Sequence, residues 1–327
     1  IRTICRDENE PYLFAVGLER GNATIGHATF TTLFLREHNR IARLLEQTYG
    51  WTDDDRLFET ARNIVIVLLL KLVIEEYVMH IGAWDIPLTI PHFVADKAHW
   101  NRQNWISIEF NLLYRWHSLV PDTIERSTGA PLHLNELISD NKLVMDTGID
   151  SLLGDWSRQR AGKIALWNAP DFFFEGPPGM PRIVPDTTTL MRSVKLQSYN
   201  NYRTEFGLLP LKNYDELTRD AALRQKLIDL YGEDIDDLEW YVGLFAEDYP
   251  RDYMMGELMM VMVAHDAFTQ ALTNPLLAEE VYTEATFTRL GLDIIEKETT
   301  MEPGNGILQK ILARNSMPRP VHASFKC

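Results

Sequence analysis

Cysteine is scarce in this chain, and its placement excludes two kinds of site. The sequence holds two cysteines, Cys5 and Cys327, near opposite ends of its 327 residues. A disulfide framework needs several cysteines, and a cysteine-based metal site needs them close together. We therefore expect neither, and such low cysteine usage is compatible with a reducing compartment.

Basic residues are also in deficit, which restricts the partners of the protein. The 32 Lys and Arg residues are outnumbered by 47 Asp and Glu residues, giving a formal net charge of -15. Such a charge repels phosphate backbones and anionic membrane surfaces, so we expect no nucleic-acid partner. The remaining composition, 45% hydrophobic and 24% charged, is that of a globular protein with a large core.

Long hydrophobic runs are missing as well. The longest, from Ile64 to Ile74, is interrupted by Lys71 and is shorter than the roughly 20 residues that a bilayer span requires. We expect a buried core helix there and no transmembrane segment, with the protein either cytoplasmic or peripherally associated with a membrane. The chain opens without Met and without an apolar signal segment, which leads us to expect a processed or partial chain.

The sequence is rich in helical periodicity. Apolar residues recur with the helical period over residues 30–47, and residues 52–82 begin with Thr52 as a plausible N-cap followed by acids. The proline-rich segment 171–186 predicts a loop. Without repeats or composition changes, we expect one mainly helical domain over residues 1–327. Further helices are predicted at 101–118, 133–140, 151–160, 186–194, 213–230, 234–247, 253–271 and 278–284.

Standard catalytic motifs are absent. The sequence has no H-E-x-x-H, no G-x-G-x-x-G, no Walker loop and no G-x-S-x-G. What remains is the stretch NLLYRWHSLVPD, residues 111–122, with Tyr114 and His117 three positions apart. On a helix, such a pair shares a face and is often an ordinary core pair. A neutral imidazole can also ligate haem iron, and a nearby tyrosine can then be oxidised.

Several segments around this pair resemble one family. The sequence is similar to the haem-dependent animal peroxidases, and within them to the cyclooxygenase and fatty-acid dioxygenase branch. That resemblance implies a mainly α, helical haem peroxidase fold, of which this chain would be the proximal, C-terminal part of the catalytic domain. The segments that carry it are FLREHNRIARLL (34–45), KLVIEEYVMHI (71–81), EFNLLYRWHSLVPD (109–122), SRQRAGKI (157–164), YNNYRTEFGL (199–208) and LEWYVGLFAE (238–247).

The resemblance implies roles for individual residues. His117 corresponds to the proximal ligand of the iron of haem b, and Tyr114 to the tyrosine whose radical takes a hydrogen atom from a polyunsaturated fatty acid before dioxygen adds. Peroxide would be the oxidant of the haem. Tyr77 corresponds to a tyrosine hydrogen-bonded to the radical tyrosine, and Tyr241 to one near the proximal histidine. Trp116 is counted with the residues that contact the cofactor.

A substrate channel is implied too. Methionines 255, 259 and 262 follow helical spacing, so this stripe has a second interpretation as ordinary core. The positions that correspond to the channel are Tyr77, Val78, Ile81, Gly82, Trp84, Phe110, Trp116, Met255, Met260, Val263, Ala264, Ala267 and Phe268.

Two departures from the cyclooxygenase pattern bear on the product. Trp84 stands where cyclooxygenases have the tyrosine of the channel constriction, and Ala267 where they have the serine that aspirin acetylates. We therefore expect neither prostaglandin formation nor aspirin acetylation. The distal histidine of the family has no matching motif here, and His27 lacks the surrounding family residues. We expect a missing N-terminal segment or a partner chain to carry that histidine.

Other charged residues have simpler interpretations. Arg36 and Glu37 are expected to be structural, and the acidic run 53–56 marks a helix start rather than a metal site. The favoured function is that of a haem-dependent dioxygenase acting on a polyunsaturated fatty acid. The alternatives are a haem peroxidase that oxidises small donors, and a descendant that has lost catalysis.

Overall fold

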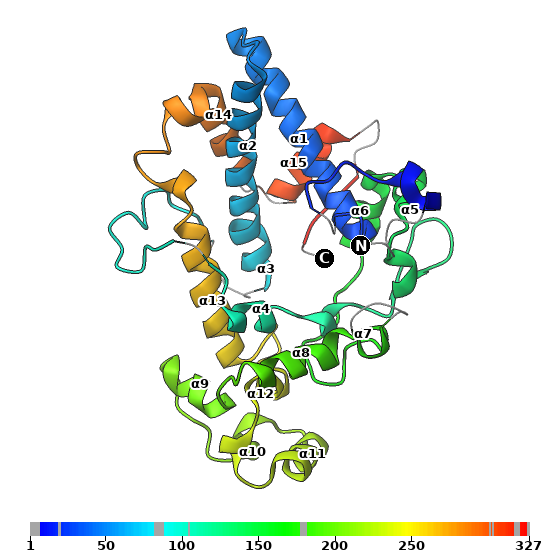
Figure 1. Ribbon diagram of the computed structural model, residues 1–327, viewed down its shortest axis with the longest axis vertical. Helices are drawn as coiled ribbons and strands as arrows, with labels where there is room; N and C mark the ends of the chain where they lie inside the picture. The colour runs from blue at the N-terminus through cyan, green and yellow to red at the C-terminus, as the bar shows by residue number, and fades with distance from the viewer. Residues whose placement is uncertain are drawn as a thin grey trace.

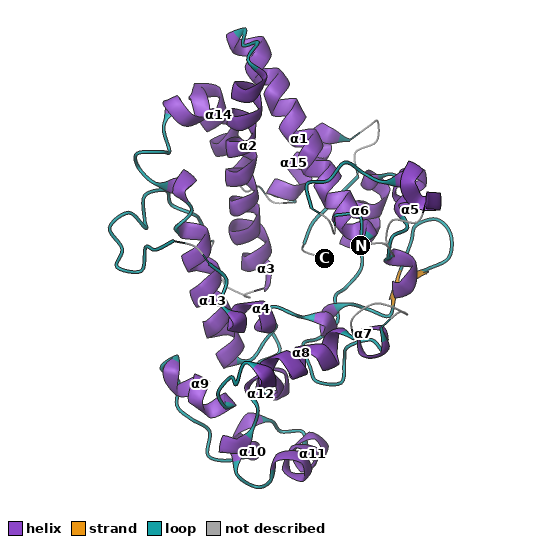
Figure 2. Ribbon diagram, in the orientation of Figure 1, coloured by secondary structure: helices purple, strands orange, loops and turns teal. Residues whose placement is uncertain are grey.

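The computed structural model describes residues 7–18, 21–81, 88–103, 105–176, 182–300, 302, 304–316 and 321–325. The two cysteines, Gly82 and Trp84 lie outside these ranges, so the predictions made for them are not addressed. Helices dominate the described chain, as the sequence indicated, and strand is confined there to one short pair (Figure 2). In that pair β1 (Thr123–Ile124) runs antiparallel to β2 (Leu132–His133).

Two long helices lie side by side in the upper half of Figure 1. α1 spans Ile25–Tyr49 and α2 spans Asp54–Lys71. Gly50, with a φ of 65°, ends α1 in the left-handed conformation that glycine adopts readily. Asp53, and not Thr52 as predicted, caps α2 by accepting a hydrogen bond from the Arg56 amide at 3.2 Å. The acidic run is therefore a helix start, as predicted.

α2 does not end as a regular α-helix. It continues into a π-helical segment, η2 (Leu72–Val78), and then into α3 (Met79–Ile81). The predicted helix over 52–82 is confirmed from Asp54 as far as Ile81, but residues 72–78 within it form wider, π-helical turns. π-Helical turns are rare and occur frequently at functional sites.

Apart from α13 and α14, with 16 residues each, the remaining described helices are short. α13 (Glu257–Leu272) connects the upper helices with the lower group of α9, α10, α11 and α12 (Figure 1). The others are η1 (Asp7–Tyr12), α4 (Ile108–Leu113), η3 (His117–Leu119), η4 (Leu134–Leu137), α5 (Asn141–Thr147), α6 (Ile149–Ser157), α7 (Phe172–Glu175), α8 (Ile183–Ser193), α9 (Tyr199–Glu205), α10 (Tyr214–Leu217), α11 (Ala221–Tyr231), η5 (Ile235–Asp237), α12 (Trp240–Ala246), η6 (Pro275–Leu277), α14 (Glu284–Thr299) and α15 (Ile307–Asn315).

Several predicted boundaries were wrong. The helix expected at 101–118 is reduced to α4, because the Ser107 side chain caps its start by accepting from the Phe110 amide. The loop expected at 171–186 contains α7 and the start of α8, where Pro185 falls in the first turn and removes no helical hydrogen bond. The helix expected at 278–284 is turn and bend over residues 278–283, and α14 begins at Glu284.

Three clusters of buried apolar residues hold the helices together. The α12–α13 core includes Leu113, Trp240, Leu258, Met259 and Met262. The α1–α15 core includes Ile25, Leu33, Ile307 and Ile311, and the α2–α14 core includes Ile64, Leu68, Phe287 and Ile295. Met259 and Met262 are 0% and 1% exposed, so these two methionines are core residues. None of the helices in the described ranges is long and apolar enough to cross a bilayer.

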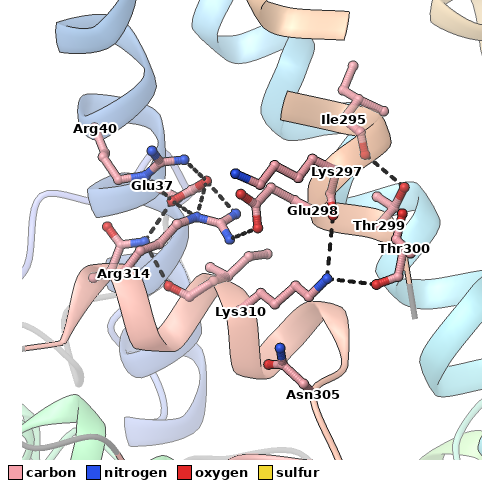
Figure 3. Close-up of polar contacts among 12 residues, drawn as sticks. Glu37, Arg40, Ile295, Lys297, Glu298, Thr299, Thr300, Asn305, Lys310 and Arg314 are labelled. Atoms are coloured by element: carbon pink, nitrogen blue, oxygen red, sulfur yellow. Dashed lines mark hydrogen bonds and ion pairs between the residues drawn. The ribbon is translucent and has the colours of Figure 1, made fainter. Parts of the chain in front are cut away.

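A buried ion cluster joins α1 to α15 (Figure 3). The Glu37 side chain is fully buried and accepts hydrogen bonds from Arg40 and Arg314, at 2.8 and 2.7 Å for the shortest contacts. Asn315 donates to the same carboxylate at 2.6 Å, and Arg314 also reaches Glu298 of α14. Glu37 is therefore structural, as predicted.

Candidate active site

Tyr114 and His117 lie just beyond the C-terminal end of α4. The last α-helical residue is Leu113, Tyr114 is the C-cap, and His117 begins the short η3. The spacing of the two residues suggested that they share one face of a helix. The structure shows that they do not, because the α-helix ends before both of them. The chain turns between them, so that the tyrosine and the histidine have different surroundings.

Tyr114 lies in an aromatic environment and is hydrogen-bonded to Tyr77 of η2. Its ring stacks on Trp116, with centroids 4.3 Å apart, and contacts Phe110 at 5.2 Å. Burial raises the pKa of Tyr114 far above its ordinary value, and the neighbouring Tyr77 raises this pKa further. Burial raises the pKa of Tyr77 as well. Both phenols are therefore protonated at neutral pH, and their O–H groups are available for hydrogen-atom transfer.

His117 has one ring nitrogen directed to the backbone. Burial lowers the pKa of His117 and the Arg115 charge lowers it further, whereas a hydrogen bond to the Arg115 carbonyl acts in the opposite direction. The Tyr241 hydroxyl donates to the same carbonyl at 3.4 Å. The ring of Phe173 lies 4.6 Å from the imidazole, centroid to centroid. Burial and the Arg115 charge thus favour a neutral imidazole, and the contacts with the Arg115 carbonyl and Phe173 hold its orientation.

Arg115 is itself held in place, which stabilises the carbonyl between His117 and Tyr241. Its guanidinium donates to Thr187 of α8 at 2.8 Å and to the Asn111 side chain at 2.7 Å. The sequence interpretation did not include Arg115, because the group that matters is a backbone oxygen and leaves no side-chain pattern.

These features fit an axial ligand of haem iron. Histidines that bind metals usually donate the other ring N–H to a carbonyl or carboxylate, which fixes the tautomer and leaves the second nitrogen for the metal. His117 has such a carbonyl, and its lowered pKa favours the neutral form that can coordinate iron. Beside it, Trp116 Nε1 and Ser118 Oγ are buried without a hydrogen-bond partner among the described residues. Trp116 directly precedes His117 in the sequence, and Tyr241 contacts the Arg115 carbonyl. Both side chains are 8% exposed.

Most of the described channel positions belong to, or pack against, the apolar clusters that Tyr77 and Tyr114 also contact. Tyr77, Ile81, Phe110, Trp116, Met255, Met260 and Val263 belong to the α12–α13 core or pack against it. Val78 belongs to the α2–α14 core, and Phe268 and Tyr77 pack against it. Ala264 and Ala267 are partly buried on α13, on the face that Met260, Val263 and Phe268 share by helical spacing. The channel role of these residues stays a prediction.

Two cavities in the described chain lie elsewhere. The larger, of about 660 Å³, lies between η2, residues 88–92 and α14. The smaller, of about 380 Å³, is lined by residues of 125–127 and 155–160. Neither is lined by Tyr114, His117 or a predicted channel position.

Comparison with known proteins agrees with the fold and with the motifs. Prostaglandin G/H synthase 1 of Rattus norvegicus is 32% identical over 313 residues, which is 95% of this chain and 49% of the relative. The enzyme of the same name from Mus musculus is 34% identical over 273 residues, 84% of this chain and 44% of the relative. The chain thus spans about half the length of these relatives.

Solved structures show the same fold at lower identity. The fatty acid alpha-dioxygenase of Arabidopsis thaliana superposes with a TM-score of 0.79 at 17% identity, covering 94% of this chain and 57% of that one. Peroxidase A from Dictyostelium discoideum superposes with a TM-score of 0.75 at 20% identity, covering 96% of this chain and 60% of that one. The model of the animal haem peroxidase family matches residues 2–314. With that match over nearly its whole length, the chain belongs to the animal haem peroxidase family.

Proposed function

We propose that this chain provides the proximal haem ligand and the radical tyrosine of a dioxygenase that acts on a polyunsaturated fatty acid. The observation that carries the proposal is the juxtaposition at the end of α4. A partly buried, neutral histidine lies three residues from a tyrosine that is hydrogen-bonded to a second tyrosine. The relatives named for prostaglandin synthesis and the structures named for fatty-acid dioxygenation support the same class of reaction.

His117 would hold haem b through the ring nitrogen that does not face the Arg115 carbonyl, with Trp116 and Tyr241 beside it. When bound, haem supplies one-electron oxidising power from a peroxide. Tyr114 would lose one electron and its phenolic proton to that oxidant, and its phenoxyl form would then serve as the hydrogen-atom acceptor. Its phenoxyl form takes a weak allylic or bis-allylic hydrogen from the fatty acid, dioxygen adds to the carbon radical, and the peroxyl radical takes the hydrogen atom back from Tyr114.

The apolar face of α13 would position the acyl chain. Met260, Val263 and Phe268 share this face and belong to the two clusters that meet at Tyr77. With Ala267 in place of an acetylatable serine, and Trp84 in place of the constriction tyrosine, we predict a fatty-acid hydroperoxide rather than a prostaglandin. The source of the distal histidine, an N-terminal segment or a partner chain, stays a prediction, as does the compartment.

A second candidate is a haem peroxidase that oxidises small donors. It is supported by the likeness in fold to peroxidase A from Dictyostelium discoideum, which is named as a peroxidase. Such an enzyme would need the haem site but no channel for an acyl chain. A chain that has lost catalysis would lack the haem as well.

One experiment separates these possibilities. Full-length, haem-loaded protein is incubated with linoleate and peroxide, and the products are identified by mass spectrometry. We expect oxygenated linoleate from the parent protein, none from Tyr114→Phe, and unchanged peroxide consumption in that variant, because only the phenolic O–H is removed.

The matched control is Tyr202→Phe, which removes a phenol that donates to Glu109 of α4 at 2.8 Å without touching Tyr114. It should oxygenate linoleate like the parent. Oxygenation by Tyr114→Phe at the parental rate would refute the radical assignment. A parent protein that consumes peroxide with small donors but leaves linoleate unchanged would be the second candidate.

A further inference from the structure

Three consecutive residues of the π-helical segment are anchored to three different parts of the molecule. Glu75 accepts a hydrogen bond from the Ile90 amide at 2.7 Å. Glu76 accepts one from the Leu308 amide at 3.0 Å, and Tyr77 is hydrogen-bonded to Tyr114. In an α-helix or a π-helix, neighbouring side chains point in different directions. Fixing the direction of one of them therefore fixes the direction of the next.

Glu76 binds the N-terminal end of α15 through hydrogen bonds. Its side chain is buried, and its carboxylate receives hydrogen bonds from the amides of Ile307 and Leu308, the first two residues of that helix. The N-cap of α15 is Gly306, which has no side chain to accept those bonds. An ideal Cβ on Gly306 would lie 2.5 Å from Glu76 Oε1, so the glycine is what allows the carboxylate to approach.

α15 also holds in place Phe325, a second residue that contacts Tyr77. Gln309 of α15 donates to the Val321 carbonyl at 3.1 Å and accepts from the Ala323 amide at 2.6 Å. This pairing holds residues 321–325, and Phe325 packs edge-on against Tyr77 with ring centroids 5.4 Å apart. One short helix thus fixes both the residue that precedes Tyr77 and an aromatic ring that contacts it.

We propose that Glu76 is a positioning residue, which holds the Tyr77 hydroxyl against Tyr114 by binding the N-terminal end of α15. The proposal rests on the proposed function in one respect, since it treats Tyr114 as the reacting phenol. A hydrogen bond between two hydroxyls needs an oxygen separation of about 2.5 to 3.0 Å. A small rotation of η2 would therefore separate the two tyrosines without unfolding the segment.

The position of Tyr77 can be measured without haem or fatty acid. The full-length protein is prepared with 3-fluorotyrosine in place of Tyr114, and the fluorine NMR signal reports the hydrogen bond at the adjacent hydroxyl. Tyr77→Phe defines the signal that lacks the bond. We expect Glu76→Ala to move the signal toward that of Tyr77→Phe, and Glu76→Gln, which keeps one acceptor oxygen, to move it less.

The matched control is Glu37→Gln, because Glu37 is a second buried carboxylate that binds α15, at its opposite end. It should destabilise the protein but leave the signal of the fluorinated residue unchanged. Gly306→Ala serves as a second perturbation, since it keeps the Glu76 charge and displaces the carboxylate sterically. It should reproduce the shift of Glu76→Ala even if that variant folds poorly.

Oxygenation kinetics give the second measurement. We expect Glu76→Ala to lower kcat for linoleate about 10-fold or more, with KM unchanged, because misplacing a reacting group by about 1 Å has effects of that size. The double variant Glu76→Ala/Tyr77→Phe should be no slower than Tyr77→Phe alone, since both changes act on one hydrogen bond.

The outcomes separate this inference from the proposed function. A fluorine signal unchanged in both Glu76→Ala and Gly306→Ala would overturn the positioning role, whatever the enzyme does. Shifted signals in a protein that leaves linoleate unchanged would uphold the positioning of the tyrosine pair and refute the proposed reaction. A Glu37→Gln signal that shifts as far as that of Glu76→Ala would show a general loosening of α15 and would also overturn the inference.

Discussion

The buried carboxylate of Glu37 should be among the largest single electrostatic contributions to the stability of this fold. The test is Glu37→Gln, which keeps the shape of the side chain and removes its charge. Burial alone would raise the pKa of Glu37, but the hydrogen bonds and charges of Arg40 and Arg314 outweigh burial and lower it from 4.5 to about 2. The folded state therefore prefers the ionised form strongly.

The magnitude follows from that pKa. A fall from 4.5 to about 2, at about 1.36 kcal/mol for each pH unit, corresponds to about 3 kcal/mol of stability at pH 7. The same range, about 3 to 5 kcal/mol, is typical when one partner of a buried ion pair is removed. Because the folded pKa is depressed, this contribution is complete above pH 4.5 and is lost as the pH falls toward 2. By pH 3 it should be less than half of its value at pH 7.

Urea unfolding of the parent and of Glu37→Gln, at several pH values from 7 to 3, measures this difference. We expect a gap of about 3 kcal/mol at pH 7 that narrows steadily below pH 4.5, since the variant has no carboxylate at this position to protonate. The matched control is Glu59→Gln, which breaks an exposed ion pair with Arg62 on α2 and should change stability by less than about 1 kcal/mol. A gap below 1 kcal/mol at pH 7, or one that is constant with pH, would refute this account.

Two further predictions concern the haem ligand and the helix contacts. His117→Ala should lose haem or hold it loosely, because this imidazole would be the bond between the protein and the iron; an unchanged Soret band and spin state in the purified variant would place the ligand elsewhere. Gly243→Ala should destabilise the protein by about 1 to 3 kcal/mol, because an added Cβ would lie 2.2 Å from the fully buried Tyr199 ring. The control, Gly26→Ala on α1, meets nothing closer than 4.0 Å, so a thermal midpoint equal to that of Gly243→Ala would contradict the steric explanation.

The long helices could be predicted from sequence because each has a continuous apolar stripe and clear end signals. Asp53 and Gly50 mark the junction of α1 and α2, and both act there as capping theory expects. α14 was not predicted, and its helical geometry is broken at Thr288, which has a φ of 62°. α15 was missed because it is short and begins at a glycine, Gly306, whose capping group comes from another helix.

In the site, a contact between two side chains could be predicted from the sequence, whereas contacts to backbone atoms could not. The resemblance implied the hydrogen bond between Tyr77 and Tyr114, and the structure has it. Contacts to backbone atoms, such as that of Glu76 with the amides of α15 and that of Tyr241 with the Arg115 carbonyl, leave no pattern in the side chains. One available signal was the pair of acids 75 and 76 directly after the longest apolar run, where charges are costly unless they are bound.

The two carboxylates that hold α15 also determine when this fold can be completed during synthesis. Glu37 precedes its partner Arg314 by 277 residues, and Glu76 precedes the Leu308 amide by 232. At a translation rate of about 5 to 20 residues per second, Arg314 is synthesised roughly 15 to 55 s after Glu37. Over that interval Glu37 of α1 has Arg40 as its partner but lacks Arg314, and Glu76 of η2 lacks the α15 amide that binds it. We therefore expect both segments to stay loosely docked on the ribosome until the last helix has emerged.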